Sequence, residues 1–499
     1  MPSLKKIVIA ASVAFVAGAG ASMAFERHAQ ADDDLYKQLR PLMESLTLIQ
    51  NNYVDEDKVK SQALIQGAIK GMMGQLDPFS QYMDPQEATD MKQDTQGSFG
   101  GLGIEISLKA KVLTVVSPIE DTPADKAGIK AGDSIIKIDG VTTDGMELMD
   151  AVHKMRGEPG SKVVISIFRD GFLEPKDFSI TRAIIKIRSV KSSLLVGKVA
   201  YIRLSTFMGK SADDFETALR DLEGKGAQSL IIDVRNNPGG LLNAAAEISG
   251  NFVPKGKVVV STAGRYKDKD LHFDSEGTGN WHKPTVILVN GGSASASEIL
   301  AGALQDYGLA VVVGTKSFGK GSVQTILPLS DGGGLRLTTA KYLTPKGRSL
   351  HGQGVDPDVI AEEEPYSKLM IDLFDENLFE LFIKDYLVEH PGFNLDELPK
   401  EAVKVSESSW QHLKPESRES KLLKDYAEWL AKRGKRIDTD DYIRDRTHII
   451  AKLKEELARK AGGEDAAREV SLANDPQIHR ALDVLKVASV YQAQGKAKK

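Results

Sequence analysis

VILVNGGSASASEILAGALQDYGLAVVVGTKSFGKGSVQT, residues 286–325, combines two apolar runs with two clusters of reactive side chains. Residues 286–289 form a short apolar run, as in a buried strand, and the turn residues 290–292 end this run. Ser295-Ala296-Ser297-Glu298 then matches the capping box that opens a helix. We therefore expect a strand, a turn and a helix in this order.

The second half of the stretch predicts a loop between two strands. Residues 309–313 are apolar, the glycine-rich residues 314–322 follow, and residues 323–327 look extended. Lys320 lies in this loop. A serine hydroxyl is a weak nucleophile until a base takes its proton, and a neutral lysine can be that base. The three serines at 293, 295 and 297 and Lys320 therefore suggest a nucleophile and its base.

Lysine acts as a base only when it is neutral. With an ordinary pKa of about 10.4, fewer than roughly one lysine in a thousand is neutral at pH 7. The fold must therefore bury the Lys320 amine or place it beside another cation. Gly319 and Gly321 would let the backbone pack closely around it. The exposed amides at the helix start, including that of Ala296, could stabilise an oxyanion.

Two other interpretations of these residues remain open. Ser295 could serve only as a helix cap. Residues 314–320 match the Walker phosphate loop G-x-x-x-x-G-K, but Gly321 stands where a hydroxyl residue would bind magnesium. A strand is also expected after this loop, instead of a helix whose N-terminus would hold phosphate. Nucleotide binding is therefore disfavoured.

These motifs resemble those of the C-terminal processing peptidases, or tail-specific proteases, which use a Ser/Lys dyad. S-A-S-A-S-E at residues 293–298 and F-G-K-G-x-V-Q at residues 318–324 both match, and the separation of 25 residues (320 minus 295) is the family's. The resemblance implies that Ser295 is the nucleophile, Lys320 the general base and Gln324 the residue that orients the lysine. Local spacing alone does not choose among the three serines.

Composition narrows the function classes. A chain of 499 residues should hold about three domains. A net charge of −5 argues against a nucleic-acid footprint. The chain has no cysteine, which excludes disulfides, thiolate metal sites and a cysteine nucleophile. We expect no cofactor and no metal site.

The N-terminus has the form of a secretory signal. Lys5-Lys6 precedes an apolar run over residues 7–25, and Ala-x-Ala cleavage candidates lie at 19–21, within this run, and at 29–31, after it. Residues 1–31 are therefore expected to direct export to the periplasm or elsewhere in the bacterial envelope. The run is also long enough for an uncleaved anchor in the inner membrane.

Helical periodicity covers residues 35–95, and two apolar stripes predict two packed helices. The stripes suggest a structural hairpin or a dimer contact. They consist of Leu39, Leu42, Met43, Leu46 and Ile49, and of Ala63, Ile65, Ala68, Ile69 and Met72.

Residues 96–183 predict a strand-rich domain with one helix near 145–155. Gly101-Leu102-Gly103-Ile104 resembles the carboxylate-binding loop of PDZ domains, and residues 122–140 match their second signature. Such a domain captures a peptide by strand addition, while loop amides hold its terminal carboxylate. Arg156, at the end of the helix, could sense the peptide or could be a solvated surface charge. A groove closed by the chain itself is the alternative.

Strands and helices alternate through residues 184–361. Residues 230–234 are expected to form a strand, which ends in a glycine turn at 235–240, whose amides can point into a site. The resemblance implies an α/β core of the crotonase-like kind. It also implies that this turn donates one oxyanion-hole amide, from Gly240 or alternatively Gly239, with Ala296 giving the other.

Residues 362–499 form a charged extension with helical apolar stripes, which need a partner surface on this chain or on another copy. The stripes are Leu422, Tyr426, Trp429 and Leu430; Ile443, Ile450, Leu453 and Leu457; and Ile478, Leu482 and Leu485. A homo-oligomer is therefore one expectation for this extension. The expected fold class is multidomain α/β: a peptidase core, an inserted PDZ domain, an N-terminal helical segment and a C-terminal helical extension.

Three functions follow as hypotheses. The first is an exported serine endopeptidase that binds the C-terminal tails of proteins through its PDZ domain and cleaves them at an active site formed by Ser295 and Lys320. The second is a catalytically silent PDZ adaptor that binds protein tails. The third is a Ser/His/Asp hydrolase that uses His272, His282 or His351, although no G-x-S-x-G frames the serines. An adaptor protein is a further candidate partner, whereas nucleic acids and nucleotides are not expected.

Overall fold

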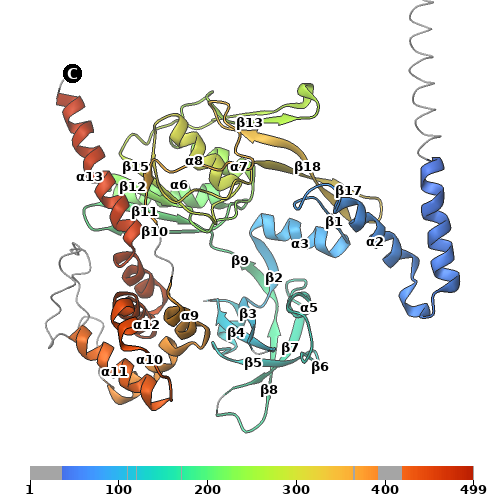
Figure 1. Ribbon diagram of the computed structural model, residues 1–499, viewed down its shortest axis with the longest axis horizontal. Helices are drawn as coiled ribbons and strands as arrows, with labels where there is room; N and C mark the ends of the chain where they lie inside the picture. The colour runs from blue at the N-terminus through green and yellow to red at the C-terminus, as the bar shows by residue number, and fades with distance from the viewer. Residues whose placement is uncertain are drawn as a thin grey trace, which may run out of the picture. The chain divides into compact units, whose positions relative to one another are not determined.

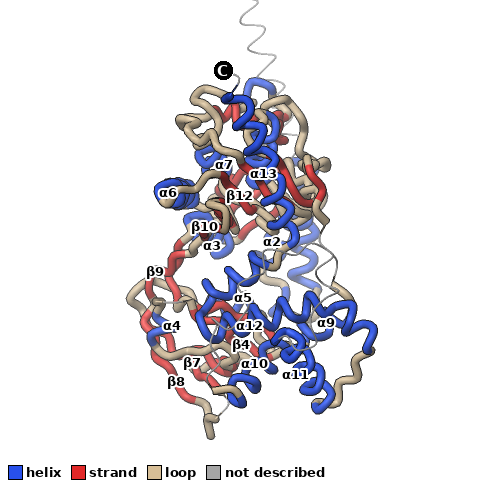
Figure 2. Tube along the Cα trace, turned by 90° about the vertical axis from the view of Figure 1, so that its left-hand side faces the viewer, coloured by secondary structure: helices blue, strands red, loops and turns tan. Residues whose placement is uncertain are grey.

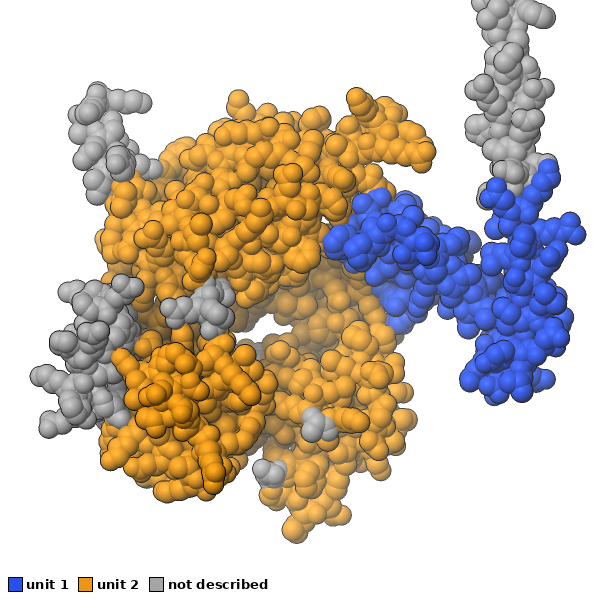
Figure 3. Space-filling model, in the orientation of Figure 1, with its two compact units in different colours: residues 1–89, 324–338 blue, residues 90–323, 339–499 orange. Residues whose placement is uncertain are grey.

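The computed structural model describes residues 36–109, 111–119, 121–169, 171–362, 366–391 and 418–497. The chain divides into two compact units, residues 1–89 with 324–338 and residues 90–323 with 339–499 (Figure 3). The expected signal segment, residues 1–31, lies outside the described residues. None of the helices in the described part is long and apolar enough to span a bilayer.

A six-stranded sheet forms the centre of the second unit (Figure 1). In spatial order its strands are β10 (Val190–Leu195), β11 (Val199–Leu204), β12 (Ser229–Asp233), β15 (Thr285–Val289), β16 (Val311–Gly314) and β19 (Val359–Ile360). β10 pairs antiparallel with β11, and the other neighbours are parallel. Every residue of β12 and β15 is buried. The apolar runs inside them, residues 230–232 and 286–289, fit central strands of a parallel sheet that is covered on both faces.

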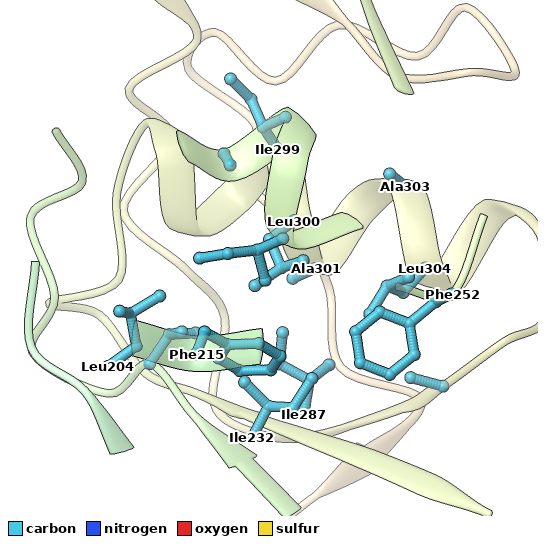
Figure 4. Close-up of a cluster of buried hydrophobic side chains, with 14 of the residues drawn as sticks. Leu204, Phe215, Ile232, Phe252, Ile287, Ile299, Leu300, Ala301, Ala303 and Leu304 are labelled. Atoms are coloured by element: carbon cyan, nitrogen blue, oxygen red, sulfur yellow. The ribbon is translucent and has the colours of Figure 1, made fainter. Parts of the chain in front are cut away.

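Three helices cover one face of this sheet. They are α6 (Ser211–Gly224), α7 (Leu242–Ser249) and α8 (Ala296–Asp306). Ile232 and Ile287 point from the central strands toward this side, where Phe215 and Leu300 pack on them (Figure 4). This cluster is the largest core of the unit, and it fixes the start of α8 against the ends of β12 and β15.

The opposite face is covered by the end of the chain. Ile231 and Leu288 alternate with Ile232 and Ile287 along the strands, so their side chains emerge on the other face. There they form a second cluster with Ile478 and Leu485 of α13 (Pro476–Ala497), which lies across the strands in both views (Figures 1 and 2). The third predicted stripe of the extension therefore finds its partner surface on this chain.

The rest of the extension forms a helical bundle with its own core, built around the fully buried Tyr426. Its helices are α9 (Lys368–Asp375), α10 (Leu378–Glu389), α11 (Arg418–Lys432) and α12 (Thr439–Ala473), the last kinked at Gly463. Ile443, predicted on the buried stripe of α12, is 50% exposed instead.

Residues 98–181 form the strand-rich domain. Its sheet runs β3 (Ile104–Lys109), β4 (Val112–Pro118), β5 (Ser134–Ile138), β7 (Lys162–Phe168) and β8 (Lys176–Thr181), with β6 (Val141–Thr142) beside β5. The helices α4 (Pro123–Lys126) and α5 (Leu148–Met155) complete it, and β2 (Ser98–Gly101) pairs with β9 (Ala183–Lys186). Ile135, Ile165 and Ala151 belong to its separate hydrophobic core.

The first unit contains a helix over residues 36–52, then η1 (Glu56–Lys58), α2 (Ser61–Met73) and β1 (Gln81–Met83). β1 pairs with the first half of β18 (Gly334–Leu343), whose second half continues into the second unit and pairs with β13 (Val258–Gly264). The remaining elements are α3 (Pro85–Gln96), η2 (Lys267–Lys269), β14 (His272–Asp274) and β17 (Ser322–Pro328), the last of which pairs with β18.

The prediction that the two N-terminal apolar stripes pack together is wrong for the described residues. Met43 on the first helix is 60% exposed, and Met72 on α2 is 59% exposed. Leu39, Leu42, Ile49 and Ile65 are also more than 36% exposed. The residue spacing correctly predicted amphipathic helices, but spacing alone does not say what covers an apolar face.

The packing of α13 predicts that this helix stabilises the six-stranded sheet. Leu485→Ala removes a side chain that is 2% exposed and should lower the free energy of unfolding by about 2–5 kcal/mol. Val487→Ala, two residues away and 58% exposed, should change it by less than about 0.5 kcal/mol. Urea unfolding followed by tryptophan fluorescence measures both. Equal effects of the two substitutions would contradict this packing.

Candidate active site

Ser295 is the N-cap of α8 and has an unusual backbone conformation, with φ 55° and ψ −113°. A non-glycine residue held there costs about 1–3 kcal/mol, and such strain clusters at functional sites. The strand, turn and helix expected around it are present, since β15 ends at Val289 and α8 begins at Ala296. Ser295 is partly exposed at the tip of this sharp turn.

The two neighbouring serines have structural roles. Ser293 is fully buried; its hydroxyl donates to the carbonyl of Val234 at 2.7 Å and accepts the Asn290 amide at 3.0 Å. Ser297 is also fully buried and donates to the carbonyl of Asn237 at 2.9 Å. Of the three serines left open by the sequence, only Ser295 is accessible to a substrate.

The glycine turn after β12 lies directly against Ser295. A Cβ added to Gly239 would lie 2.7 Å from the carbonyl oxygen of Ala294 and 2.8 Å from the Cβ of Ser295. The Ala294 amide also donates to the Asn237 carbonyl at 3.0 Å. Only glycine permits this approach, so the turn and the serine form one rigid arrangement.

The backbone N–H groups around Ser295 differ in whether they already donate a hydrogen bond. The Gly239 N–H donates to the side-chain oxygen of Asn237 at 2.9 Å, so it is already used inside the turn. The N–H groups of Gly240 and Ala296 donate to no acceptor among the described residues. Backbone donors beside an exposed serine are the arrangement that stabilises an oxyanion in acyl transfer.

Glu298 joins two segments: the serine turn, residues 290–295 between β15 and α8, and the lysine loop, residues 315–321 between β16 and β17. Its carboxylate is fully buried and accepts the Ser295 N–H at 2.8 Å and the Lys320 N–H at 2.9 Å on one oxygen. The other oxygen accepts the Gly319 N–H and the Ser317 hydroxyl, each at 2.6 Å. Four donors therefore converge on two carboxylate oxygens, which a carboxylate can satisfy because it has acceptor sites only.

The sequence had indicated only the local half of this role. The capping box predicted the bond between the Glu298 side chain and the Ser295 amide. The bonds to residues 317–320 join residues about twenty positions apart in the sequence, and no local sequence pattern predicts them.

Lys320 lies on the loop between β16 and β17, as predicted, and is partly buried. The Phe318 amide of this loop donates to the Ser293 carbonyl at 3.0 Å. A Cβ on Gly321 would lie 2.1 Å from the backbone nitrogen of His351, so this glycine allows the close packing expected of it. The loop is thus tied to the serine turn on one side and to residues 350–354 on the other.

Gln324 lies on β17, and its side-chain amide donates to the hydroxyl of Thr338 on β18 at 2.9 Å. It is the first residue of the segment 324–338, which belongs to the first compact unit, whereas Ser295 and Lys320 belong to the second.

No Ser/His/Asp triad is assembled among the described residues. The ring nitrogen Nδ1 of His351 is buried and has no hydrogen-bond partner, so no carboxylate orients this ring. His272 and His282 are exposed. In the same part of the chain, no group of three or more His, Asp or Glu side chains is arranged to hold a metal ion.

The carboxylate-binding loop predicted in the strand-rich domain joins β2 to β3. The N–H groups of Leu102 and Gly103, between the strands, donate to no described residue. β3, which starts at Ile104, pairs only with β4 within the described part of the chain. Its other edge offers backbone groups to an added strand, which counts against a groove closed by the chain itself.

Arg156 is less solvated than a free surface arginine. Its side chain is 21% exposed, its guanidinium lies 4.3 Å from the centre of the Phe99 ring, and it pairs with Asp94 of α3 at 3.1 Å. It therefore connects the end of α5 with α3 and with β2, the strand that Gly101 ends.

Three family profiles match parts of this chain. The profile of Peptidase family S41 matches residues 198–361, that of the PDZ domain matches residues 100–180, and that of the Activating protease CtpB N-terminal domain matches residues 11–87. The solved structure of the photosystem II D1 C-terminal processing protease is 31% identical, with a TM-score of 0.40, and the match covers 64% of this chain and 92% of that one.

Two relatives are closely similar over most of their length. Carboxy-terminal processing protease CtpB of Bacillus subtilis is 41% identical over 342 residues, which are 68% of this chain and 71% of the relative. The Carboxy-terminal-processing protease of Bartonella bacilliformis is 43% identical over 365 residues, which are 72% of this chain and 83% of the relative. The matched profiles and these two relatives confirm the expected family and the multidomain α/β fold. The chain belongs to the carboxy-terminal processing protease family and is a serine-type peptidase with a PDZ domain.

Proposed function

We propose that this protein is an exported endopeptidase that binds the C-terminal tails of proteins through its PDZ domain and cleaves them by a Ser295/Lys320 acyl-enzyme mechanism. The observation that carries the proposal is the convergence on Ser295. The serine turn, the glycine turn at 235–240 and the lysine loop are all fixed to one another by buried hydrogen bonds.

In the proposed first step, neutral Lys320 takes the proton of the Ser295 hydroxyl. The serine oxygen attacks the carbonyl carbon of the peptide, and the carbonyl electron pair moves onto its oxygen. Collapse of this tetrahedral intermediate breaks the C–N bond, and the leaving amine takes the proton from the lysine ammonium. Lys320 then takes a proton from a water, whose oxygen attacks the carbonyl carbon of the acyl-serine. Collapse of this second tetrahedral intermediate breaks the bond between that carbon and the serine oxygen and releases the new C-terminus, and the lysine ammonium returns its proton to the serine oxygen.

The amide donors around Ser295 support this chemistry. We assign the oxyanion hole to the N–H groups of Gly240 and Ala296, because the Gly239 N–H is occupied by Asn237. Losing one such donor typically costs about 10²–10³-fold in kcat. We assign to Gln324 the orientation of Lys320, as the family resemblance implies.

Tail capture is proposed for the loop 101–104 and the edge of β3. The unused N–H groups of Leu102 and Gly103 can donate hydrogen bonds to a terminal carboxylate, and the open edge of β3 can pair with the preceding residues of the tail. Arg156, which packs on Phe99 beside this loop, is the residue that we propose senses the bound peptide. The proposal of export rests on the basic and apolar residues 5–25.

The dyad is tested with a disordered protein substrate and mass spectrometry of its products. Ser295→Ala and Lys320→Ala should each lower kcat by on the order of 10³-fold or more, because each removes a group that changes a bond in the reaction. Lys316→Ala is the matched control, since Lys316 is in the same loop, is 57% exposed and pairs with Asp356. Full cleavage by Ser295→Ala would exclude Ser295 as nucleophile, and a wild type that binds tails without cutting would favour an adaptor role.

Glu298→Gln tests the carboxylate that joins the two loops. The variant places an NH₂ group against N–H and O–H donors, so the serine and the lysine should separate slightly. Displacements of about 1 Å can cost roughly 10²-fold in rate, so kcat should fall 10- to 100-fold with little change in KM. Glu247→Gln, on the exposed side of α7, is the control. An unchanged kcat for Glu298→Gln would contradict this role.

The PDZ assignment predicts that the free carboxylate of a tail dominates its binding. A peptide ending in a carboxylate should bind at least tenfold more tightly than the same peptide ending in an amide, since the amide cannot offer an anion to the loop N–H groups. Isothermal titration with the Ser295→Ala protein measures both peptides without cleavage. Equal affinities would show that the loop 101–104 does not recognise the terminal carboxylate of the peptide.

A further inference from the structure

We infer that the C-terminal extension is a positioning element of the active site, acting through Asp475 and Gln477 on Arg235. The inference rests on the proposed function, because Arg235 opens the turn 235–240 to which we assign an oxyanion donor. It gives a catalytic role to a segment that lies beyond residue 361, where the match to Peptidase family S41 ends.

The contacts are short and almost fully buried. Arg235, whose side chain is 11% exposed, pairs with the Oδ2 atom of Asp475 at 2.7 Å and donates to the Oε1 atom of Gln477 at 2.7 Å. Gln477 is 1% exposed, and its Nε2 group donates to the carbonyl of Ala361 at 2.6 Å. The extension therefore fixes the arginine from one side through two separate bonds.

Asp233 fixes the same arginine from the other side. It accepts the Nη2 group of Arg235 at 2.7 Å and both the Nε and backbone N–H groups at 3.0 Å. Arg203 also donates to Asp233 at 2.7 Å. Burial opposes ionisation of Asp233, but Arg235 first and then Arg203 outweigh it and hold the pKa of this carboxyl below its ordinary value.

This buried cluster is charge-balanced only when the extension is in place. Asp233 and Asp475 supply two negative charges, and Arg203 and Arg235 supply two positive charges. Removing the charge of Asp475 would leave a mostly buried guanidinium with one carboxylate shared between two arginines. Buried groups that lose a partner are strongly unfavourable, so the arginine would move toward solvent.

Such a movement of Arg235 would displace the glycine turn at 235–240. The residue after Arg235 is Asn236, whose N–H donates to the Asn290 side chain at 2.8 Å. The next residue, Asn237, accepts the Ala294 amide and the Ser297 hydroxyl through its carbonyl. These contacts hold the glycine turn against the serine turn. Displacement of Arg235 would therefore shift the Gly240 amide relative to Ser295.

Asp475 divides its two oxygens between two tasks, which makes a clean variant available. Its Oδ1 atom accepts the N–H groups of Gln477 and Ile478 at 2.8 and 3.1 Å and thereby caps α13, while Oδ2 serves Arg235. In Asp475→Asn the amide oxygen can keep the cap. Its NH₂ group would then face the arginine donors, so the variant removes the ion pair and retains the helix start.

The test compares Asp475→Asn with Asp483→Asn on the same helix, where Asp483 is 62% exposed and pairs with Lys486. Active sites are titrated with a fluorophosphonate that labels Ser295, so rates are expressed per competent site, and thermal unfolding is followed in parallel. Asp475→Asn should lower kcat per titrated site about tenfold with KM within roughly twofold, as expected for a misplaced catalytic group. Asp483→Asn should match the wild type.

Gln477→Met, which removes the second bond to Arg235 without changing charge, should show the same pattern and serves if Asp475→Asn fails to fold. A lower unfolding temperature with unchanged kcat per titrated site in these variants would overturn the inference, because that is the signature of a purely structural role. A wild type that fails to cleave at all would overturn the proposed function and the inference together.

Discussion

The buried carboxylate of Glu298 is the interaction on which the catalytic geometry depends. Holding Ser295 at a positive φ costs about 1–3 kcal/mol. Hydrogen bonds to a charged group contribute about 1.5–3 kcal/mol each, and Glu298 accepts four. These four bonds oppose the strain at Ser295 and order the loop of Lys320 at the same time. One side chain thus sets the relation between two segments that are far apart in the sequence.

The six-stranded sheet explains why the C-terminal extension packs on the unit that contains Ser295 and Lys320. β12 and β15 carry apolar side chains on both faces, so each face requires a covering layer. The helices α6 to α8 cover one face, and α13 supplies Ile478 and Leu485 to the other. Without α13, the strands that end at the glycine turn and at the serine turn would expose Ile231 and Leu288 to water.

The sequence predicted what local chemistry determines. The apolar run, the turn and the capping box placed Ser295 at a helix start, and the glycines placed Lys320 in a loop. What it missed depends on contacts across long stretches of chain. The second role of Glu298, the partner surface of α13 and the exposure of the N-terminal stripes all fall in this class. A period of 3.6 residues identifies an apolar face but carries no information about its partner.

The serine is therefore held from two directions by acidic side chains that link distant segments of the chain. Glu298 ties it to residues 317–320, and Asp233 with Asp475 fixes the arginine that opens the turn at 235–240. Hydrophobic contacts tolerate small shifts, whereas buried ionic hydrogen bonds lose much of their energy when their geometry is lost. Small displacements in either network should thus impair catalysis before the hydrophobic core, made largely by separate residues, loses its packing. We therefore expect the proposed active-site geometry to be lost more easily than the fold that carries it.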